Sequence, residues 1–320
     1  MGTDNHIPEF VQRIRNGDLR ALSRAITAVE NHTPESTALL KELFPHSGGA
    51  VLLGFTGAPG AGKSTLVDQV AHAYRKQGKS IGIVAVDPTS PFSGGAILGD
   101  RIRMQSHHAD PGIFIRSMAT RGSLGGLAST TADVATVLDA SGKDLILIET
   151  VGVGQDEVDI VRLADITIVI LVPGMGDDVQ TIKAGIMEIA DIFVINKSDR
   201  EGAERVEREI RAMQALAARA DKWAVPIVKT VATEGAGVAD LAAAIVQYEA
   251  FLEKNGLLLQ KKTENWRQRL VEMLREALLA RVLQEQMGDG AVARYAAEVA
   301  EHRRDPYTLV DEIVQKLGKS

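Results

Sequence analysis

Eight consecutive residues, Gly57 to Ser64, carry the strongest chemical pattern in the chain. The stretch GAPGAGKS matches G-x-x-x-x-G-K-[ST] at every fixed position, between an apolar run and a helical segment. Glycines let backbone N–H groups converge on phosphate oxygens, and the helix start adds a favourable dipole. We expect Lys63 to reach the β- and γ-phosphates and the Ser64 hydroxyl to ligate Mg²⁺. The predicted phosphate-binding residues are Gly57, Ala58, Pro59, Gly60, Ala61, Gly62, Lys63, Ser64 and Thr65.

A second pattern, Asn196-Lys197-Ser198-Asp199, fits the N-K-x-D motif that follows a strand in GTP-binding proteins. The Asp199 carboxylate only accepts hydrogen bonds, and guanine offers N1–H and N2–H₂ as a donor pair, whereas adenine N1 is an acceptor. A buried mismatch costs roughly a hundredfold in specificity. We expect Lys197 to pack over the base and Asn196 to hold the loop. A final base-facing loop is predicted at Val231, Ala232 and Thr233.

Three carboxylates are expected to join Ser64 at the metal ion. Asp87 and Glu149 each close an apolar run near the phosphate loop, the usual place for a direct or water-mediated Mg²⁺ contact. Asp100 lies in the glycine-rich segment 93–104, which fits a switch loop ordered by the γ-phosphate. Gly152, after Glu149-Thr150-Val151, is expected to donate its N–H to the γ-phosphate. The predicted catalytic group is Lys63, Asp87, Asp100, Glu149 and Gly152.

The residue after Gly152 predicts slow hydrolysis. A Ras-like protein places its water-orienting glutamine directly after this glycine, but here that position is Val153, and Gln155 lies two residues further on. We therefore expect a partner or a second loop to complete the site. Arg116, Arg121 and Lys183 are candidate transition-state cations, with ordinary surface charge as the favoured interpretation of each. The adjacent His107 and His108 are not expected to bind metal, because neighbours do not share a helix face.

The elements that must position these residues form an α/β pattern. Short runs rich in Val and Ile alternate with helix-length segments, and most are continuously apolar, as in parallel strands covered on both faces. We predict a P-loop NTPase fold: a doubly wound, mostly parallel sheet with N- and C-terminal helical extensions. The predicted strands are 51–56, 80–86, 113–115, 145–148, 166–172, 192–195 and 226–230. The expected domains are an extension at 1–49, a P-loop GTPase domain at 50–252 and an extension at 253–320.

The two flanks are predicted to be helical. Apolar residues recur at helical spacing through 7–44, with a break and a cap at Asn16-Gly17-Asp18, and His46 to Gly49 form a candidate linker. A C-terminal stripe begins at Trp266 and Leu270, which we expect in a homodimer interface, since aromatic anchors often dominate interfaces. The alternative is that the stripe caps its own domain. The stripe comprises Trp266, Leu270, Met273, Leu274, Ala277, Leu278 and Val282.

The composition of the chain excludes several classes of protein. The chain has 320 residues, 45% of them hydrophobic and 24% charged, which is ordinary for globular proteins. A net charge of −6 gives no electrostatic reason to expect nucleic acid, and the longest apolar run is too short for a membrane span. The chain has no cysteine, which excludes thiolate metal sites and suits a reducing compartment. The first residues lack the features of a signal peptide, so a cytoplasmic protein is expected.

Several segments together resemble one family. The set GAPGAGKST, AVDPTSPFSGGAILGDRIRM, IRSMATRGSLGG, ETVGVGQ and NKSD is similar to the MeaB/MMAA/ArgK family of GTPases, strongly over residues 50–241. The resemblance implies a homodimeric G-protein chaperone of adenosylcobalamin-dependent acyl-CoA mutases, chiefly methylmalonyl-CoA mutase. Such a protein gates cofactor delivery and protects the mutase, and a cobalamin adenosyltransferase is a further candidate partner. The resemblance also implies a third switch at residues 173–183.

Two other classes stay open. A P-loop metallochaperone would share the architecture, but such proteins usually deliver nickel with Cys and His ligands, and this chain has no cysteine. A kinase is the other alternative, because family members have carried arginine-kinase and transport labels. No acceptor-binding motif is visible in the sequence. Nickel titration and transfer of labelled γ-phosphate would separate these classes from a GTPase.

Overall fold

The computed structural model describes residues 6–87, 110–119, 126–150, 163–174, 190–216, 219, 221–286 and 290–317. By packing, the chain divides into two compact units, Met1–Lys262 and Thr263–Ser320. In the described residues, no helix is both long enough and apolar enough to cross a bilayer. The three-domain division expected from the sequence is a statement about independent folding and stays a prediction.

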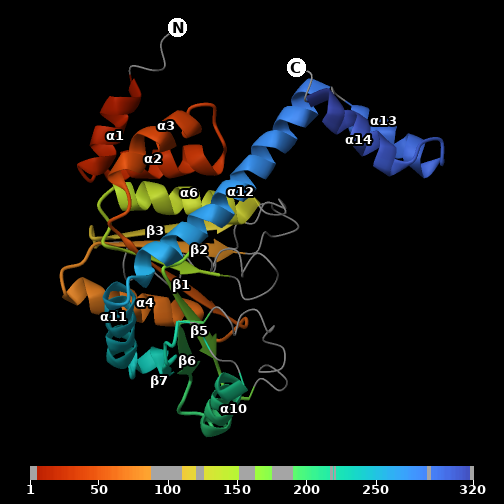
Figure 1. Cartoon of the computed structure of the whole chain (residues 1–320). Helices are drawn as coiled ribbons and strands as arrows, with labels where there is room; N and C mark the ends of the chain where they lie inside the picture. Colours follow the sequence, from red (N-terminus) through yellow and green to blue (C-terminus); the bar gives the residue numbers. More distant parts are fainter. Residues whose placement is uncertain are drawn as a thin grey trace. The chain divides into compact units, whose positions relative to one another are not determined.

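The first unit is built on a parallel sheet of seven strands among the described residues (Figure 1). Its order is β3-β2-β4-β1-β5-β6-β7, and every neighbouring pair is parallel. The doubly wound α/β fold is thus confirmed. The strands are β1 (Val51–Gly57), β2 (Ile81–Asp87), β3 (Ile113–Ala119), β4 (Leu145–Glu149), β5 (Ile166–Leu171), β6 (Ile192–Asn196) and β7 (Ile227–Thr230).

Each predicted apolar run coincides with a strand, and the largest difference is at the third. This strand continues past residue 115 to Ala119, through Arg116 and Ser117, which interrupt the apolar run. The strand tolerates a charged residue because β3 lies at the edge of the sheet. The Arg116 side chain bonds to Glu30 of a neighbouring helix, which satisfies its charge.

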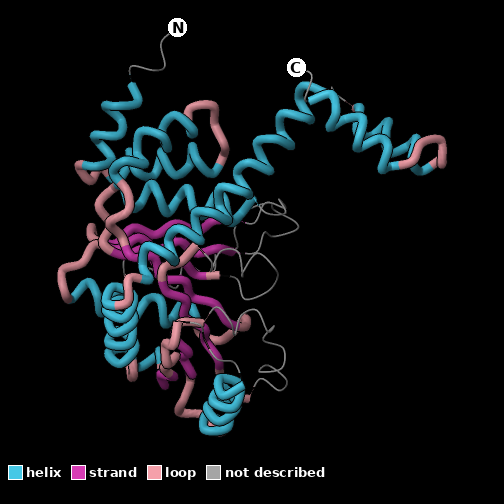
Figure 2. The backbone as a smooth tube through the Cα atoms, viewed as in Figure 1, coloured by secondary structure: helices cyan, strands magenta, loops and turns pink. Residues whose placement is uncertain are grey.

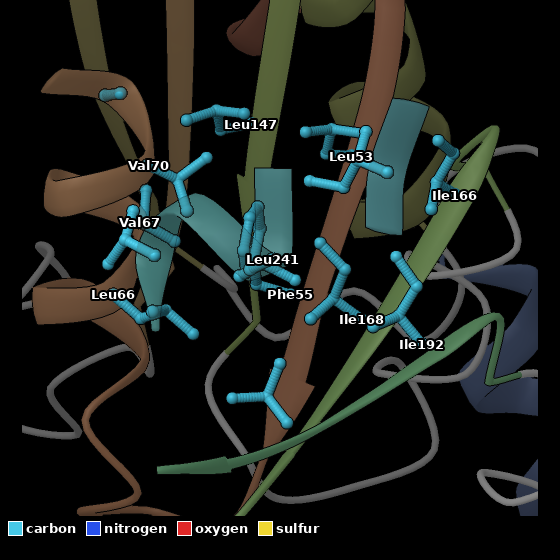
Figure 3. Close-up of a cluster of buried hydrophobic side chains, with 14 of the residues drawn as sticks. Leu53, Phe55, Leu66, Val67, Val70, Leu147, Ile166, Ile168, Ile192 and Leu241 are labelled. Atoms are coloured by element: carbon cyan, nitrogen blue, oxygen red, sulfur yellow. The ribbon is translucent and has the colours of Figure 1, made fainter. Parts of the chain in front are cut away.

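Helices cover both faces of the sheet, and Figure 2 shows the strands between two helical layers. One face packs against α4 (Lys63–Lys76) and α11 (Val238–Lys254). Figure 3 shows the resulting core, in which Leu53 and Phe55 of β1 lie among side chains from α4, from α11 and from neighbouring strands. Leu53 and Phe55 are fully buried, as a central parallel strand covered on both faces requires.

The opposite face is covered by α6 (Gly126–Ala140) and, outside it, by three N-terminal helices. These are α1 (Ile7–Arg15), α2 (Leu19–Glu30) and α3 (Ser36–Leu43), followed by the short η2 (Phe44–His46). The predicted cap is confirmed: the Asp18 carboxylate accepts bonds from the backbone N–H groups of Arg20 and Ala21 at 2.9 and 3.0 Å. The N-terminal helices therefore belong to the compact unit of the sheet.

The remaining helices of this unit lie near the last strands. α10 (Ala203–Leu216) packs on β5 and β6, and the short η4 (Ala232–Glu234) follows β7. α12 (Leu257–Gln286) begins in the first unit and continues into the second, where α13 (Ala291–Ala300) and α14 (Pro306–Leu317) complete the described helices. The predicted helical character of both flanks is confirmed.

Candidate functional site

The site lies where the strand order reverses. β1 is central, and the strands that follow it in the chain are placed on both of its sides. In open α/β sheets, ligands bind beyond the carboxyl ends of the strands at such a point. The loop after β1 therefore leads directly into the place where this fold binds ligands.

Glycines at residues 57–62 give this loop its shape. Gly57, Gly60 and Gly62 have φ angles of 151°, 77° and 87°, a region that other residues rarely adopt. A Cβ atom on Gly57 would lie 2.2 Å from the carbonyl oxygen of Ile170, and one on Gly62 would lie 2.4 Å from Asn196 Nδ2. Only glycine fits these two positions without a shift of the neighbouring groups.

The first turn of α4 directs main-chain donors into this loop. The Leu66 N–H donates to the Gly62 carbonyl at 3.0 Å, and this bond opens the helical ladder. The amides of Lys63, Ser64 and Thr65 precede it in the first turn, and a helix N-terminus favours an anionic ligand. Lys63 is 6% exposed, and its Nζ donates to the carbonyls of Gly57 and Ala58 at 2.8 and 3.2 Å. Amides and ammonium together can neutralise a phosphate chain.

The predicted metal ligands Ser64 and Glu149 contact each other through their side chains. The Ser64 Oγ donates to Glu149 Oε1 at 2.6 Å, and Glu149 is 5% exposed. Glu149 closes β4 opposite Phe55 of β1 and Ala85 of β2, so the sheet register aligns it with the phosphate loop. A hydroxyl and a carboxylate are hard oxygen donors that suit Mg²⁺. Among the described residues, no group of three or more His, Cys, Asp or Glu side chains that could hold a metal ion is found, either here or elsewhere.

Other predicted residues of the metal and switch regions cannot be placed. The backbone of Asp87 ends β2 and pairs with Ala119, but its side chain is not described. The following residues lie outside the described part: Asp100, the rest of segment 93–104, His107, His108, Arg121, Gly152, Val153, Gln155, Lys183 and 175–183 of the expected third switch.

The predicted base loop is joined to the phosphate loop by two side chains. Asn196, 2% exposed, donates from Nδ2 to the Ala61 carbonyl at 2.8 Å. Lys197 donates from Nζ to the Gly60 carbonyl at 2.8 Å and has a φ of 55°, unusual for a residue with a side chain. Two bonds between residues 135 and 137 positions apart thus join the two loops. Asp199 follows in the same loop, where the Arg200 N–H donates to the Lys197 carbonyl.

The third predicted segment also reaches this loop. The Ala232 N–H donates to Asn196 Oδ1 at 3.1 Å, and Ala232 is buried, whereas Thr233 is exposed. Val231 pairs with Ala236 in a short bridge. Sequence reasoning missed Thr230, which donates to the same Asn196 oxygen. Its only signal in the sequence was a hydroxyl residue at the end of a predicted strand, directly before the expected loop.

Arg116 is held by the N-terminal helices. Its Nε donates to Glu30 Oε1 at 2.8 Å, its Nη2 forms a second bond to the same carboxylate, and Thr27 also contacts it. The hydrogen bonds to Glu30 raise the pKa of Arg116, so its charge is firmly kept. Arg116 therefore links α2 to the edge strand by an ion pair.

Comparisons with known proteins agree with this geometry. A family model described as methylmalonyl-CoA mutase-associated GTPase MeaB matches residues 22–287. A putative GTPase of Pyrococcus abyssi is 48% identical, with 97% of each chain covered. The GTPase ArgK of Escherichia coli is 35% identical over 90% of this chain and 88% of its own.

One solved structure resembles the whole chain. The crystal structure of a LAO/AO transport system kinase has a TM-score of 0.73 and 26% identity, and covers 99% of both chains. The parallel sheet, the glycine loop before α4 and the family match over most of the length thus lead to one conclusion. This chain is a P-loop GTPase by family, and it belongs to the methylmalonyl-CoA mutase-associated GTPases of the MeaB type.

Proposed function

We propose that this chain binds GTP and GDP with Mg²⁺ at the site formed by the phosphate loop and the Asn196–Asp199 loop. The observation that carries the proposal is the buried bond from Asn196 to the Ala61 carbonyl, which joins the proposed phosphate-binding loop to the proposed base-selecting loop. The acceptor-only carboxylate of Asp199 would select guanine. Lys63 and the amides that begin α4 would hold the phosphates.

Ser64 and Glu149 would hold the metal ion, with Asp87 and Asp100 as further proposed ligands. The close contact of the Ser64 hydroxyl and the Glu149 carboxylate supports this assignment. When bound, Mg²⁺ would supply charge neutralisation at the β- and γ-phosphates. The test is nucleotide titration with and without Mg²⁺. GTP affinity should exceed ATP affinity by roughly a hundredfold, and equal affinities would refute the guanine assignment.

Hydrolysis without a partner is proposed to be slow. Val153 occupies the position after Gly152 where a Ras-like protein has glutamine. The described candidate cation Arg116 is engaged by Glu30, which supports this proposal. A measured unassisted rate well above roughly 1 s⁻¹ would contradict this proposal, since switch GTPases alone are far slower.

The partner proposed is an adenosylcobalamin-dependent acyl-CoA mutase of the methylmalonyl-CoA type. The family description supports it. In this role the GTPase would gate cofactor loading and protect the mutase, and a cobalamin adenosyltransferase would be a further partner. Immobilised chain should retain purified methylmalonyl-CoA mutase with a non-hydrolysable GTP analogue and release it with GDP. Retention that is absent in every nucleotide state would count against the mutase. The cytoplasmic location belongs to the same proposal, and cell fractionation tests it.

Self-association through α12 is also part of the proposal. Leu270, Leu274 and Leu278 recur every four residues and are 53%, 61% and 56% exposed, a stripe of the kind that usually meets a partner. Trp266 is half-buried, with the Arg269 guanidinium 4.6 Å from its ring centroid. Leu274→Glu should shift the sedimentation of the chain from dimer to monomer. Leu216→Glu, at an 89% exposed position on α10, is the matched control.

A kinase activity is the second candidate, because the resembling solved structure is described as a transport system kinase. Incubation with γ-labelled GTP or ATP separates the two. Label in inorganic phosphate supports the GTPase. Label on arginine or on protein would support the kinase instead. A nickel titration in the same buffer tests the metallochaperone alternative, for which no soft ligand cluster exists in the described part of the chain.

A further inference from the structure

Thr230 ends β7 and contacts the base loop at two points. It is 1% exposed. Its Oγ1 donates to Asn196 Oδ1 at 3.1 Å, and its carbonyl oxygen accepts a bond from the Ser198 N–H, also at 3.1 Å. Asn196 and Thr230 are register partners in the parallel β6–β7 pair. A single buried residue thus contacts the loop through both its side chain and its backbone.

These contacts determine which way the Asn196 amide faces. Its oxygen accepts bonds from the Thr230 hydroxyl and from the Ala232 N–H, each at 3.1 Å. Its nitrogen donates to the Ala61 carbonyl of the phosphate loop at 2.8 Å. An amide oxygen only accepts and an amide nitrogen only donates, so two donors on one side leave the NH₂ group for the carbonyl on the other. Asn196 is 2% exposed, so water has little access to replace a lost bond.

We propose that Thr230 is a positioning residue for nucleotide binding, which sets the Asn196 amide and thereby keeps the base loop attached to the phosphate loop. Thr230 acts through Asn196 and has no assigned contact with the ligand. The inference rests on the proposed guanine nucleotide site. It adds to that site a residue that lies in neither recognition motif.

The hydroxyl can be removed without changing the shape of the side chain. Thr230→Val keeps the branched Cβ that suits a strand and deletes the donor. The buried Asn196 oxygen then loses one of two bonds, which corresponds to about a tenfold weaker affinity for nucleotide. GDP and GTP should weaken by the same factor, because the effect acts at the base loop and its bond to Ala61, and not at the γ-phosphate. Thr230→Ser keeps the donor and should bind within about twofold of the unchanged chain.

The experiment uses the full chain and titrates a fluorescent GDP analogue, then GTP and ATP by competition, at a temperature where every variant is folded. The expected result is a tenfold loss in T230V, rescue in T230S, and a smaller ratio of GTP to ATP affinity in T230V. KM for GTP should rise while kcat is unchanged. A merely structural role would lower the thermal midpoint of the nucleotide-free chain and leave these affinities alone. T230A is the second variant if T230V does not fold.

Asp199→Ala, measured in parallel, separates the two possible failures. If D199A loses guanine preference but T230V binds all three nucleotides within twofold of the unchanged chain, Thr230 has no positioning role. If the unchanged chain and D199A both bind GTP and ATP equally, the guanine site itself is wrong and this inference is overturned with it. Both the guanine site and the positioning role of Thr230 are supported if D199A loses its guanine preference and T230V loses nucleotide affinity that T230S restores.

Discussion

The sheet has an amino edge, where its strands begin, and a carboxyl edge, where they end, and the two use polar side chains in different ways. At the amino edge, carboxylates accept bonds from the backbone N–H groups that start the strands. At the carboxyl edge, cationic and amide side chains donate to carbonyls of the glycine loop that leads into α4. The amino-edge carboxylates are Asp139, Asp144, Asp165 and Asp191. The carboxyl-edge donors are Lys63, Asn196 and Lys197.

The most buried member of the amino edge is Asp191, 2% exposed. It accepts bonds from the Thr167 N–H at 2.9 Å, from Lys261 Nζ at 2.6 Å and from Arg219 Nη2 at 3.1 Å. Burial lowers the pKa of Arg219, but its hydrogen bonds to Asp221 and the nearby charge of Asp191 outweigh this, so the pKa is raised overall. All these charges are compensated by groups of the chain itself.

The difference shows that buried charge alone does not identify a ligand site. Asp191 is as buried as Asn196, but its neighbours supply a complete set of partners. The carboxyl edge differs in its backbone, because glycines with positive φ shape the loop that leads into the start of α4, and a helix N-terminus favours anions. Substitutions at the amino edge should therefore change the stability of the fold, and substitutions at the carboxyl edge should change the affinity for nucleotide.

The largest effect is expected for Asp191→Ala. The substitution removes a carboxylate from two cations and leaves the Thr167 N–H without its acceptor, which should cost about 3 to 4 kcal/mol in the free energy of unfolding. Urea denaturation measures the loss. Nucleotide affinity of the folded fraction should not change, and a variant that kept its stability but lost affinity would break the comparison. The matched control is Glu209→Ala, which removes the exposed pair with Arg205 and should leave the midpoint unchanged.

Gly62→Ala, in contrast to Asp191→Ala, should mainly weaken nucleotide binding. Its Cβ would meet Asn196 Nδ2 at 2.4 Å and force a side chain onto a φ of 87°, so the loop must shift. Nucleotide affinity should fall by at least roughly a hundredfold, about 2.8 kcal/mol. Gly78→Ala is the control, since Gly78 has a similar φ of 81° but nothing within 4 Å of the added atom. Calorimetry measures the affinity, which Gly78→Ala should leave unchanged because Gly78 follows the C-terminal end of α4 and lies outside the phosphate loop. A G62A variant that binds nucleotide as tightly as the unchanged chain would contradict the expected shift of the loop.

The contrast between the edges also explains what the sequence could predict. The phosphate loop and the Asn196–Asp199 loop are short motifs, each made of consecutive residues. The strands around them are continuous apolar runs. Both kinds of pattern can be recognised without knowing which strands are neighbours. The predicted strands and the sheet class were therefore confirmed.

Contacts between distant residues left no such pattern. Arg116 and Glu30 are 86 positions apart, and each alone is an ordinary charged residue. The bond of Thr230 to Asn196 depends on β6 and β7 being adjacent and in register, which the sequence did not state. The candidate linker at His46 to Gly49 is held by Asp139, 91 positions from Gly48. The glycines of this segment predicted an unattached linker, because the sequence does not show that the Asp139 carboxylate, on α6, accepts bonds from their N–H groups.

Asp139→Ala is expected to have an intermediate effect on stability. The Asp139 carboxylate accepts bonds from three successive N–H groups, those of Gly48, Gly49 and Ala50, at 2.5, 3.1 and 3.0 Å. Their loss where β1 begins should reduce the free energy of unfolding by about 1 to 2 kcal/mol. Hydrogen exchange of these three amides should accelerate. Asp139→Asn retains one acceptor oxygen and should recover part of the loss, whereas full recovery would show that the second oxygen contributes nothing.

The smallest effect, with the opposite sign, is expected for Asp165→Asn. Burial raises the pKa of Asp165 above its ordinary value of 3.8, although its bond from the Leu52 N–H at 3.0 Å and the nearby Lys262 and Lys261 lower it. The folded state then holds a proton that the unfolded state has released, so ionisation of Asp165 removes stability as the pH rises from about 3.8 through the folded pKa.

Asparagine keeps an acceptor for Leu52 and cannot ionise. The free energy of unfolding of D165N relative to the unchanged chain should therefore increase between pH 4 and pH 7 by less than about 1 kcal/mol. Urea denaturation across this range measures the slope. A difference that falls with pH would mean that Asp165 is stabilised as a carboxylate and that Lys261, Lys262 and the Leu52 N–H outweigh its burial.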